Sequence, residues 1–157
     1  MRNGILSCTM SARHRRPWWR KHSLTLVASA ILILWIVLYA RSSPQTHAGS
    51  FFGNAIADWS GLVVMVIATK YLYEKGSAES KQPRGIVPNR VGEAVREHSL
   101  TIFLLVTGAV WLALFMHMDA QGKWGQVVGN IVSEWTQVLG LVLLTKRLIE
   151  TGSKDSR

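Results

Sequence analysis

The sequence predicts an all-α membrane protein with four transmembrane helices, arranged as two tandem helical hairpins. Three observations support this fold class. Of the 157 residues, 48% are hydrophobic, and they form long blocks instead of alternating with polar residues. The sequence that begins at Arg20 is repeated from Arg96 onward, and the lysines and arginines gather in alternate connecting segments. Together these features are typical of a small protein that crosses a membrane several times.

The hydrophobic blocks have the length of membrane spans. Residues 24–40 and 100–116 each contain 17 residues without a charge, about enough to cross a hydrocarbon core of roughly 30 Å. Two further blocks, residues 51–73 and 127–149, are about as long but include polar residues. We therefore expect transmembrane helices at about 23–40, 52–73, 99–117 and 127–149.

The internal repeat covers most of the chain. Residues 20–81 align without a gap on residues 96–157, with identical residues at 20 of 62 positions, which indicates a tandem duplication. Because each repeat holds an even number of helices, both copies enter the membrane from the same side, as parallel repeats about an axis along the membrane normal. The expected organisation is a basic tail (1–21), repeat 1 (22–77), a linker (78–97) that includes a short helix from Asn89 into His98, repeat 2 (98–153) and a short tail (154–157).

The net charge of +9 reflects topology more than a nucleic-acid partner. Of the 18 lysines and arginines, six precede the first span, six lie between Lys70 and Arg96, and four lie from Lys146 to Arg157. Only Arg41 and Lys123 remain for the opposite side. This positive-inside pattern places both termini and the linker in the cytoplasm of a cell whose inner (plasma) membrane holds the protein. No nucleic-acid-binding motif accompanies the charge, so we expect no nucleic-acid partner.

The second helix of each repeat carries a polar stripe. At 100° per residue, Asn54 and Asp58 share one face of the first copy, and the same face of the second copy carries the corresponding amide and acid. A carboxylate inside a membrane is costly, so it should face the bundle interior, a water-filled cavity or a partner. The candidate intramembrane polar or ion site comprises Asn54, Asp58, Asn130, Glu134 and Gln137.

Two interpretations of this stripe remain open. If Asp58 and Glu134 face each other across the pseudo-symmetry axis, they could form a proton relay or a cation site, with the amides supplying neutral oxygens. Alternatively, the carboxyl groups hydrogen-bond Trp59, Trp135 or neighbouring backbone and fix helix pairing. Beside the stripe, small residues recur every four positions and predict close helix packing; they are Gly53, Ala57 and Gly61 in the first copy, and Gly129 and Ser133 in the second.

A second set of charged residues lies at the cytoplasmic ends of the hairpins. A histidine opens the first helix of each repeat, while a lysine and a glutamate close the second, so each hairpin should gather one of each. Such clusters could act as pH-sensitive gates. The alternative is a capping and anchoring set, with Ser23 and Ser99 as N-caps and Lys70 paired with Glu74 along the helix. The candidate clusters are His22, Lys70 and Glu74, and His98, Lys146 and Glu150.

Catalytic chemistry finds little support in the sequence. The five histidines do not lie at paired depths suited to haem, and the single cysteine, Cys8, excludes an intrachain disulfide. There is no nucleophile motif or phosphate loop, so we expect no catalytic residue, metal or cofactor. The expected function is that of a structural or regulatory membrane protein, in contact with the lipid bilayer, that forms a homo-oligomer or binds another membrane protein. The alternative is a cation or proton channel or transporter that uses Asp58 and Glu134.

Overall fold

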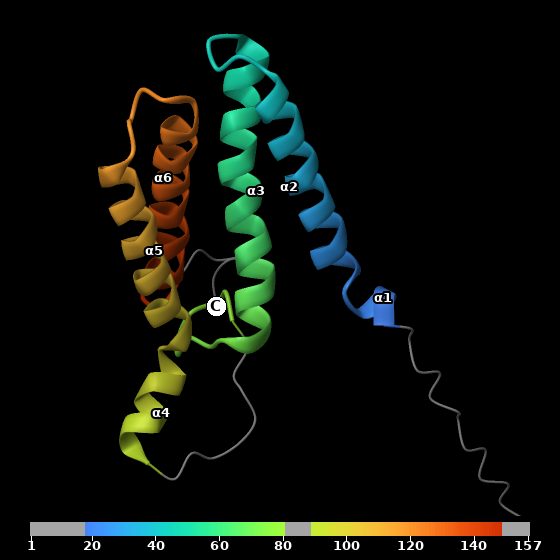
Figure 1. Cartoon of the computed structure of the whole chain (residues 1–157). Helices are drawn as coiled ribbons and strands as arrows, with labels where there is room; N and C mark the ends of the chain where they lie inside the picture. Colours follow the sequence, from blue (N-terminus) through green and yellow to red (C-terminus); the bar gives the residue numbers. More distant parts are fainter. Residues whose placement is uncertain (1–17, 81–88, 149–157) are drawn as a thin grey trace, which may run out of the picture.

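The described part of the chain, residues 18–80 and 89–148 of the computed structural model, consists of α-helices and short connections (Figure 1). Four of the helices are long and apolar enough to cross a membrane, with mean hydropathies of 2.3, 1.6, 2.2 and 1.5 in chain order. By helix length and composition, this is a small multi-pass membrane protein that contacts the lipid bilayer. The helices are α1 (Trp18–Lys21), α2 (Ser23–Arg41), α3 (His47–Tyr71), α4 (Arg90–Glu97), α5 (Ser99–His117) and α6 (Lys123–Leu144), of which α2, α3, α5 and α6 are the candidate spans.

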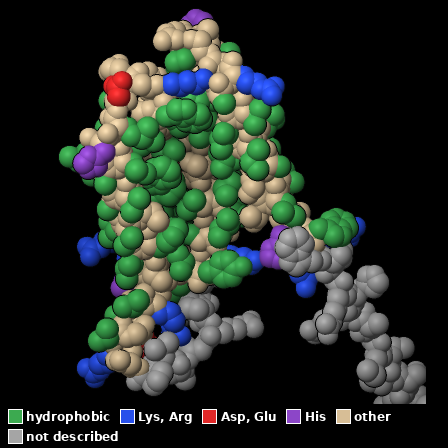
Figure 2. Space-filling view, in the orientation of Figure 1, with side chains coloured by type: hydrophobic (Ala, Val, Ile, Leu, Met, Phe, Trp, Pro, Cys, Tyr) green, Lys and Arg blue, Asp and Glu red, His purple; other side chains and the backbone are tan. Residues whose placement is uncertain are grey.

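The two second helices of the hairpins, α3 and α6, pack against each other at the centre of the bundle. Helix α2 packs on α3, and α5 packs on α6, so each flanks the central pair (Figure 1). Because α2 and α5 are apolar nearly all round, most of their surface can contact lipid instead of other helices. Figure 2 shows this surface, with hydrophobic side chains over the middle of the bundle and Lys and Arg side chains at its two ends.

The observed helix ends differ from the expected spans in the second helix of each hairpin. Helix α3 begins at His47, earlier than residue 52, because the Thr46 hydroxyl accepts a hydrogen bond from the Gly49 amide at 3.0 Å and caps the helix. Helix α6 begins at Lys123 instead of residue 127, and the two helices end at Tyr71 and Leu144 instead of residues 73 and 149. The expected spans at 23–40 and 99–117 agree closely with α2 and α5.

The short helix expected in the linker is α4. It follows Asn89, whose side-chain oxygen accepts a hydrogen bond from the Val91 amide at 3.2 Å. This is the usual arrangement for an asparagine N-cap. Helix α4 ends at Glu97, directly before His98 and the start of α5.

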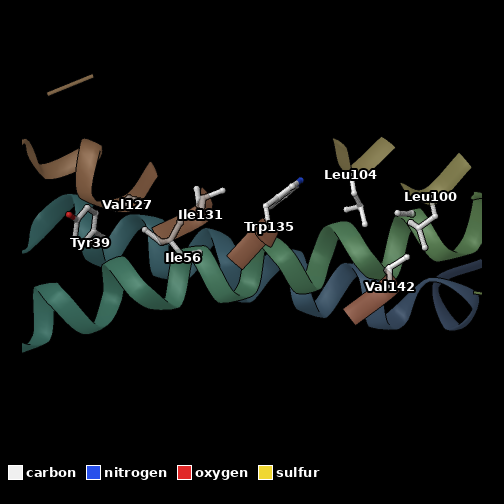
Figure 3. Close-up of a cluster of buried hydrophobic side chains, with 10 residues drawn as sticks. Tyr39, Ile56, Leu100, Leu104, Val127, Ile131, Trp135 and Val142 are labelled. Carbon is white, nitrogen blue, oxygen red and sulfur yellow. The ribbon is translucent and has the colours of Figure 1, made fainter. Parts of the chain in front are cut away.

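The hydrophobic core lies along the contact between α3 and α6 (Figure 3). Its largest member on α6 is Trp135, whose indole N–H donates to the Thr107 hydroxyl at 2.9 Å and whose ring meets Trp111 edge-on at 5.9 Å between centroids. These contacts attach α5 to the central pair. The core side chains labelled in Figure 3 come from all four spans: Tyr39, Ile56, Leu100, Leu104, Val127, Ile131, Trp135 and Val142.

Glycines allow the helices of each hairpin to approach closely. A Cβ atom at Gly53 would lie 3.1 Å from the Tyr39 ring, and one at Gly129 would lie 2.9 Å from the Phe115 ring. In the alignment of the repeats, Gly53 matches Gly129 and Tyr39 matches Phe115, so the same contact occurs in both hairpins. Of the small residues expected to form a packing ridge, Gly53, Ala57 and Gly61 are buried, Gly129 is half-buried and Ser133 is exposed.

Replacing Gly129 with valine should therefore destabilise the second hairpin. The new side chain would overlap the Phe115 ring, and such overpacking typically costs about 1–3 kcal/mol. We expect Gly129→Val to lower the melting temperature of the detergent-solubilised protein. The matched control is Gly140→Val on the same helix, since a Cβ atom at Gly140 meets nothing within 4 Å. Equal effects of the two substitutions would show that helix propensity, and not the Phe115 contact, decides stability.

Candidate functional site

The α3–α6 contact carries the polar residues that the sequence singled out. The Asn130 side-chain amide donates a hydrogen bond of 2.6 Å to the Asn54 side-chain oxygen. Asp58 and Glu134 follow one helical turn later along α3 and α6. We call these four residues, Asn54, Asp58, Asn130 and Glu134, the polar seam. Its members occupy matching positions in the sequences of the two hairpins, with Asn54 opposite Asn130 and Asp58 opposite Glu134 in the sequence alignment.

The polar seam lies at the middle of the membrane spans. Asp58 lies eleven residues after His47 and thirteen before Tyr71, and Glu134 is equally central in α6. At a rise of about 1.5 Å per residue, Asp58 is roughly 17 Å from the start of α3. The early start of α3 and α6 is what gives both carboxylates this depth.

Within a single chain the carboxylates are not buried inside the bundle, which is one of the three surroundings expected for them. Asp58 is exposed and Glu134 is partly exposed, while Gln137 is also exposed. The interior at this level is already filled, because Ile131 and Trp135 pack against α3 and α5. Glu134 instead lies over Gly61, where a Cβ atom would come within 2.8 Å of its Cγ.

The Trp135 indole N–H, one of the donors expected for these carboxyl groups, donates instead to the Thr107 hydroxyl. In residues 18–80 and 89–148, neither Asp58 nor Glu134 has a hydrogen-bond or ion-pair partner. On the cellular insertion scale, a charged side chain at mid-span costs about 2.5–3.5 kcal/mol. The seam as a whole is therefore a poor surface to present to lipid hydrocarbon, and it requires a partner, a proton, a cation or water.

A second polar site lies just outside the membrane spans, around Glu74. The Glu74 side chain is fully buried. Its carboxylate accepts hydrogen bonds from His98 Nδ1 at 2.6 Å and from the Thr101 backbone amide at 3.2 Å, and it also pairs with Lys146 Nζ. We call these residues, Glu74, His98, Thr101 and Lys146, the Glu74 cluster. It joins the end of the first hairpin to both helices of the second.

The segment after α3 positions this carboxylate by crossing to the start of α5. The Leu100 amide donates to the Tyr73 carbonyl at 3.1 Å, and the Lys75 amide donates to the Glu97 carbonyl at 2.7 Å. The Tyr73 amide donates to the Ser99 hydroxyl at 2.9 Å. The capping interpretation expected Ser99 to be the N-cap of α5, but Ser99 does not hold that position. The N-cap residue is His98, and the Glu74 carboxylate satisfies the first turn of α5 in its place.

In the cluster expected within the first hairpin, His22 and Lys70 lie together, but Glu74 does not join them. Glu74 lies beyond the end of α3 at Tyr71, so it cannot pair with Lys70 along the helix. It pairs with the histidine and lysine of the other hairpin, whereas Lys70 Nζ lies 3.2 Å from His22 Nδ1. Ser23 is likewise not the N-cap of α2, because that position belongs to His22. Glu150 lies outside the described residues.

A turn signal in the sequence follows the end of α3. Gly76 has φ = +89°, a left-handed conformation that glycine adopts without strain. Gly76 and Ser77 predict that the helix has ended by this point, but not that it ends as early as Tyr71. Nothing in the sequence alone shows which hairpin the freed carboxylate joins, because both offer the same histidine and lysine.

The environment of Glu74 sets the direction of its pKa. Burial alone would raise the pKa, but hydrogen bonds from Lys146, Thr101 and His98 outweigh burial, so the pKa of Glu74 lies below its usual value. The stabilisation that the carboxylate provides is complete above the pKa of the unfolded chain. It is lost as the pH falls through the lowered pKa of the folded protein.

Chemically, the described residues offer carboxylates, amides and cations but no assembled metal site. Within residues 18–80 and 89–148, no group of three histidine, cysteine, aspartate or glutamate side chains could hold a metal ion. No protein family, curated protein or solved structure matches the chain. Functional inference therefore depends on the chemistry of the polar seam and the Glu74 cluster.

Replacing Glu74 with glutamine should destabilise the protein at neutral pH, because Lys146 and His98 lose their anionic partner. Removing one member of a buried ion pair costs about 3 kcal/mol. We expect a lower melting temperature at pH 7 and a weaker decline of that temperature when the pH is lowered below about 4. Glu97→Gln is the control, since it breaks the more exposed pair with Lys75. An acid-induced decline as steep in Glu74→Gln as in the wild type would contradict the assignment.

Proposed function

We propose that this protein is a structural or regulatory membrane protein that self-associates through the polar seam. The observation that supports it most strongly is the position of Asp58 and Glu134, which are exposed or partly exposed at the middle of the spans. Covering this face would remove two carboxylates and an amide from hydrocarbon. The reduction in cost favours association over a free single chain.

The composition of the seam favours a second copy of the same chain as the partner that covers this face. A twofold interface places one surface against itself, so the surface must contain both donors and acceptors. The seam meets this requirement together with the neighbouring Gln137, because Asn54 and Gln137 carry amide donors while Asp58 and Glu134 carry acceptors. Exposed amides of one copy can thus donate to carboxylates of the other, and hydrogen bonds of this kind hold membrane helices together.

The proposal includes the two-repeat organisation and the orientation in the membrane. The Asn54–Asn130 bond joins equivalent positions of the two repeats, as expected at a pseudo-twofold axis along the membrane normal. The glycine–aromatic contacts also recur at equivalent positions of the repeats. The arrangement of lysines and arginines supports an orientation with both termini and the linker in the cytoplasm, and a location in the inner (plasma) membrane. The proposal assigns no catalytic residue and no enzymatic activity.

Disulfide cross-linking in native membranes tests self-association directly. In a Cys8→Ser background, Asp58→Cys should give a covalent dimer on oxidation, because equivalent residues near a twofold axis lie close together. Val110→Cys is the matched control, since Val110 is exposed on α5, away from the seam. Dimers formed through position 110 but not through position 58 would contradict the proposal. A chain that stays monomeric by native mass spectrometry in mild detergent would also contradict it.

An ion pathway is the alternative function, and one observation favours it. Two carboxylates lie near the middle of α3 and α6, with the paired amides of Asn54 and Asn130 one turn away. Two like charges in a poorly solvated site favour binding a proton or a cation between them. A single four-helix chain encloses little space, so the pathway would lie between copies.

Flux measurements distinguish the two functions. Liposomes containing the wild type should conduct protons, Na⁺ or K⁺ under the ion-pathway hypothesis, and the Asp58→Asn, Glu134→Gln variant should lose nearly all of that flux. The same variant should still cross-link through a cysteine introduced at Asn54. Absence of flux in the wild type, in liposomes where cross-linking proves association, would reject the ion pathway and leave the structural function.

A further inference from the structure

The two hairpins place the same three residues at the same end of the bundle. When the repeats are aligned, His22, Thr25 and Lys70 of the first hairpin correspond to His98, Thr101 and Lys146 of the second. In the second hairpin, the imidazole, the backbone amide and the ammonium group all bind one buried carboxylate, that of Glu74. This residue set is therefore a built anion site in the second hairpin.

In the first hairpin, the corresponding groups converge beside an open cavity. Lys70 Nζ lies 3.2 Å from His22 Nδ1, so the two side chains meet where α2 begins and α3 ends. The cavity has a volume of about 570 Å³. Its charged lining residues are Lys21, His22, Lys70 and Glu79, and the hydroxyls of Thr25 and Thr69 add polar groups. Cationic groups thus outnumber the one carboxylate in the lining.

The mouth of the cavity has the character of a membrane interface. Tyr71 lines the cavity and is 72% exposed. Trp19, which shortly precedes the lining residue Lys21 in the sequence, is 57% exposed. The Lys70 ammonium lies 5.0 Å from the centre of the Tyr71 ring, and the Arg20 guanidinium lies 5.2 Å from that of Trp19. Aromatic rings beside cations are typical of the headgroup level of a bilayer. Leu24 and Val66 add apolar lining on the side of the spans.

We propose that this cavity binds the phosphate of an anionic phospholipid headgroup. The cationic groups match a phosphate, as the equivalent groups match the Glu74 carboxylate. The volume falls within the range of sites that hold small molecules, and the apolar side of the lining suits the start of the acyl chains. Basic pockets between membrane helices bind anionic headgroups by the same physics. Only the leaflet involved, the cytoplasmic one, rests on the orientation proposed above.

Native mass spectrometry of the full-length protein in neutral detergent tests the site. The wild type should bind phosphatidylglycerol more tightly than phosphatidylcholine with the same acyl chains. The His22→Gln, Lys70→Gln double variant should bind phosphatidylglycerol at least about tenfold more weakly, because the Lys70 ammonium group and the His22 ring N–H are both lost as donors to the phosphate. The matched control is Lys75→Gln, which removes a nearby cation that pairs with Glu97 and does not line the cavity. Its affinity for phosphatidylglycerol should equal that of the wild type.

Three outcomes would overturn this assignment. Equal binding of the two lipids by the wild type would remove the role of the anionic headgroup, and an equal loss in Lys75→Gln would reduce the effect to general surface charge. If phosphatidylglycerol bound tightly to the Glu150→Gln variant but not to the wild type, the Glu150 carboxylate of the chain itself would be the occupant of the site, as the Glu74 carboxylate is in the second hairpin. Self-association is measured separately by cross-linking, so failure of one proposal is distinguishable from failure of the other.

Discussion

The contact between α3 and α6 determines how the rest of the molecule is arranged. It joins the two hairpins inside the membrane, where lipid is as apolar as the side chains and gives helices little reason to associate through hydrophobicity. Close approach must supply the attraction instead. Gly61 allows Glu134 to lie directly over α3, and the amides of Asn54 and Asn130 add a hydrogen bond at the same contact. The bulky core residues Ile131 and Trp135 then occupy the inner side, so the carboxylates remain at the outer edge of the seam.

Two acidic sites of this chain show how the surroundings decide the state of a carboxylate. Glu74 is fully buried, yet it keeps its charge because an imidazole, an ammonium group and a backbone amide all bind it. Asp58 and Glu134 lie at mid-span without such donors from residues 18–80 and 89–148. The Glu74 cluster can therefore hold the two hairpins together within one chain. The polar seam is incomplete in one chain, and this difference makes it the site from which function is inferred.

The sequence was sufficient to predict the spans but not the partners of the charged side chains. Long uncharged blocks identify α2 and α5 almost to the residue, because span length and hydropathy are properties of one segment. The start of α6 was misplaced because Lys123 binds the Ala40 and Ser42 carbonyls at the end of α2, a contact between distant segments. The helical wheel assigned Asp58 to a polar stripe of α3, but it could not predict on which side of that stripe bulky side chains such as Ile131 and Trp135 would pack. The partner of Glu74 could not be predicted, since the repeat supplies two identical sets of histidine and lysine.

Differences in sequence make the two hairpins structurally unequal. Tyr39 donates a hydrogen bond of 2.6 Å to the Lys123 carbonyl, whereas its counterpart Phe115 has no hydroxyl to donate. Gly61 accommodates Glu134, whereas its counterpart Gln137, which follows Glu134 on α6, carries an exposed polar side chain. The two edges of the seam are thus unequal: Asn54 and Asp58 of α3 are exposed, whereas Asn130 and Glu134 of α6 are partly buried. If two chains pair as proposed, the Gln137 amide of each can donate to a carboxylate of the other, so this difference between the hairpins adds donors to a seam that otherwise presents two acidic acceptors.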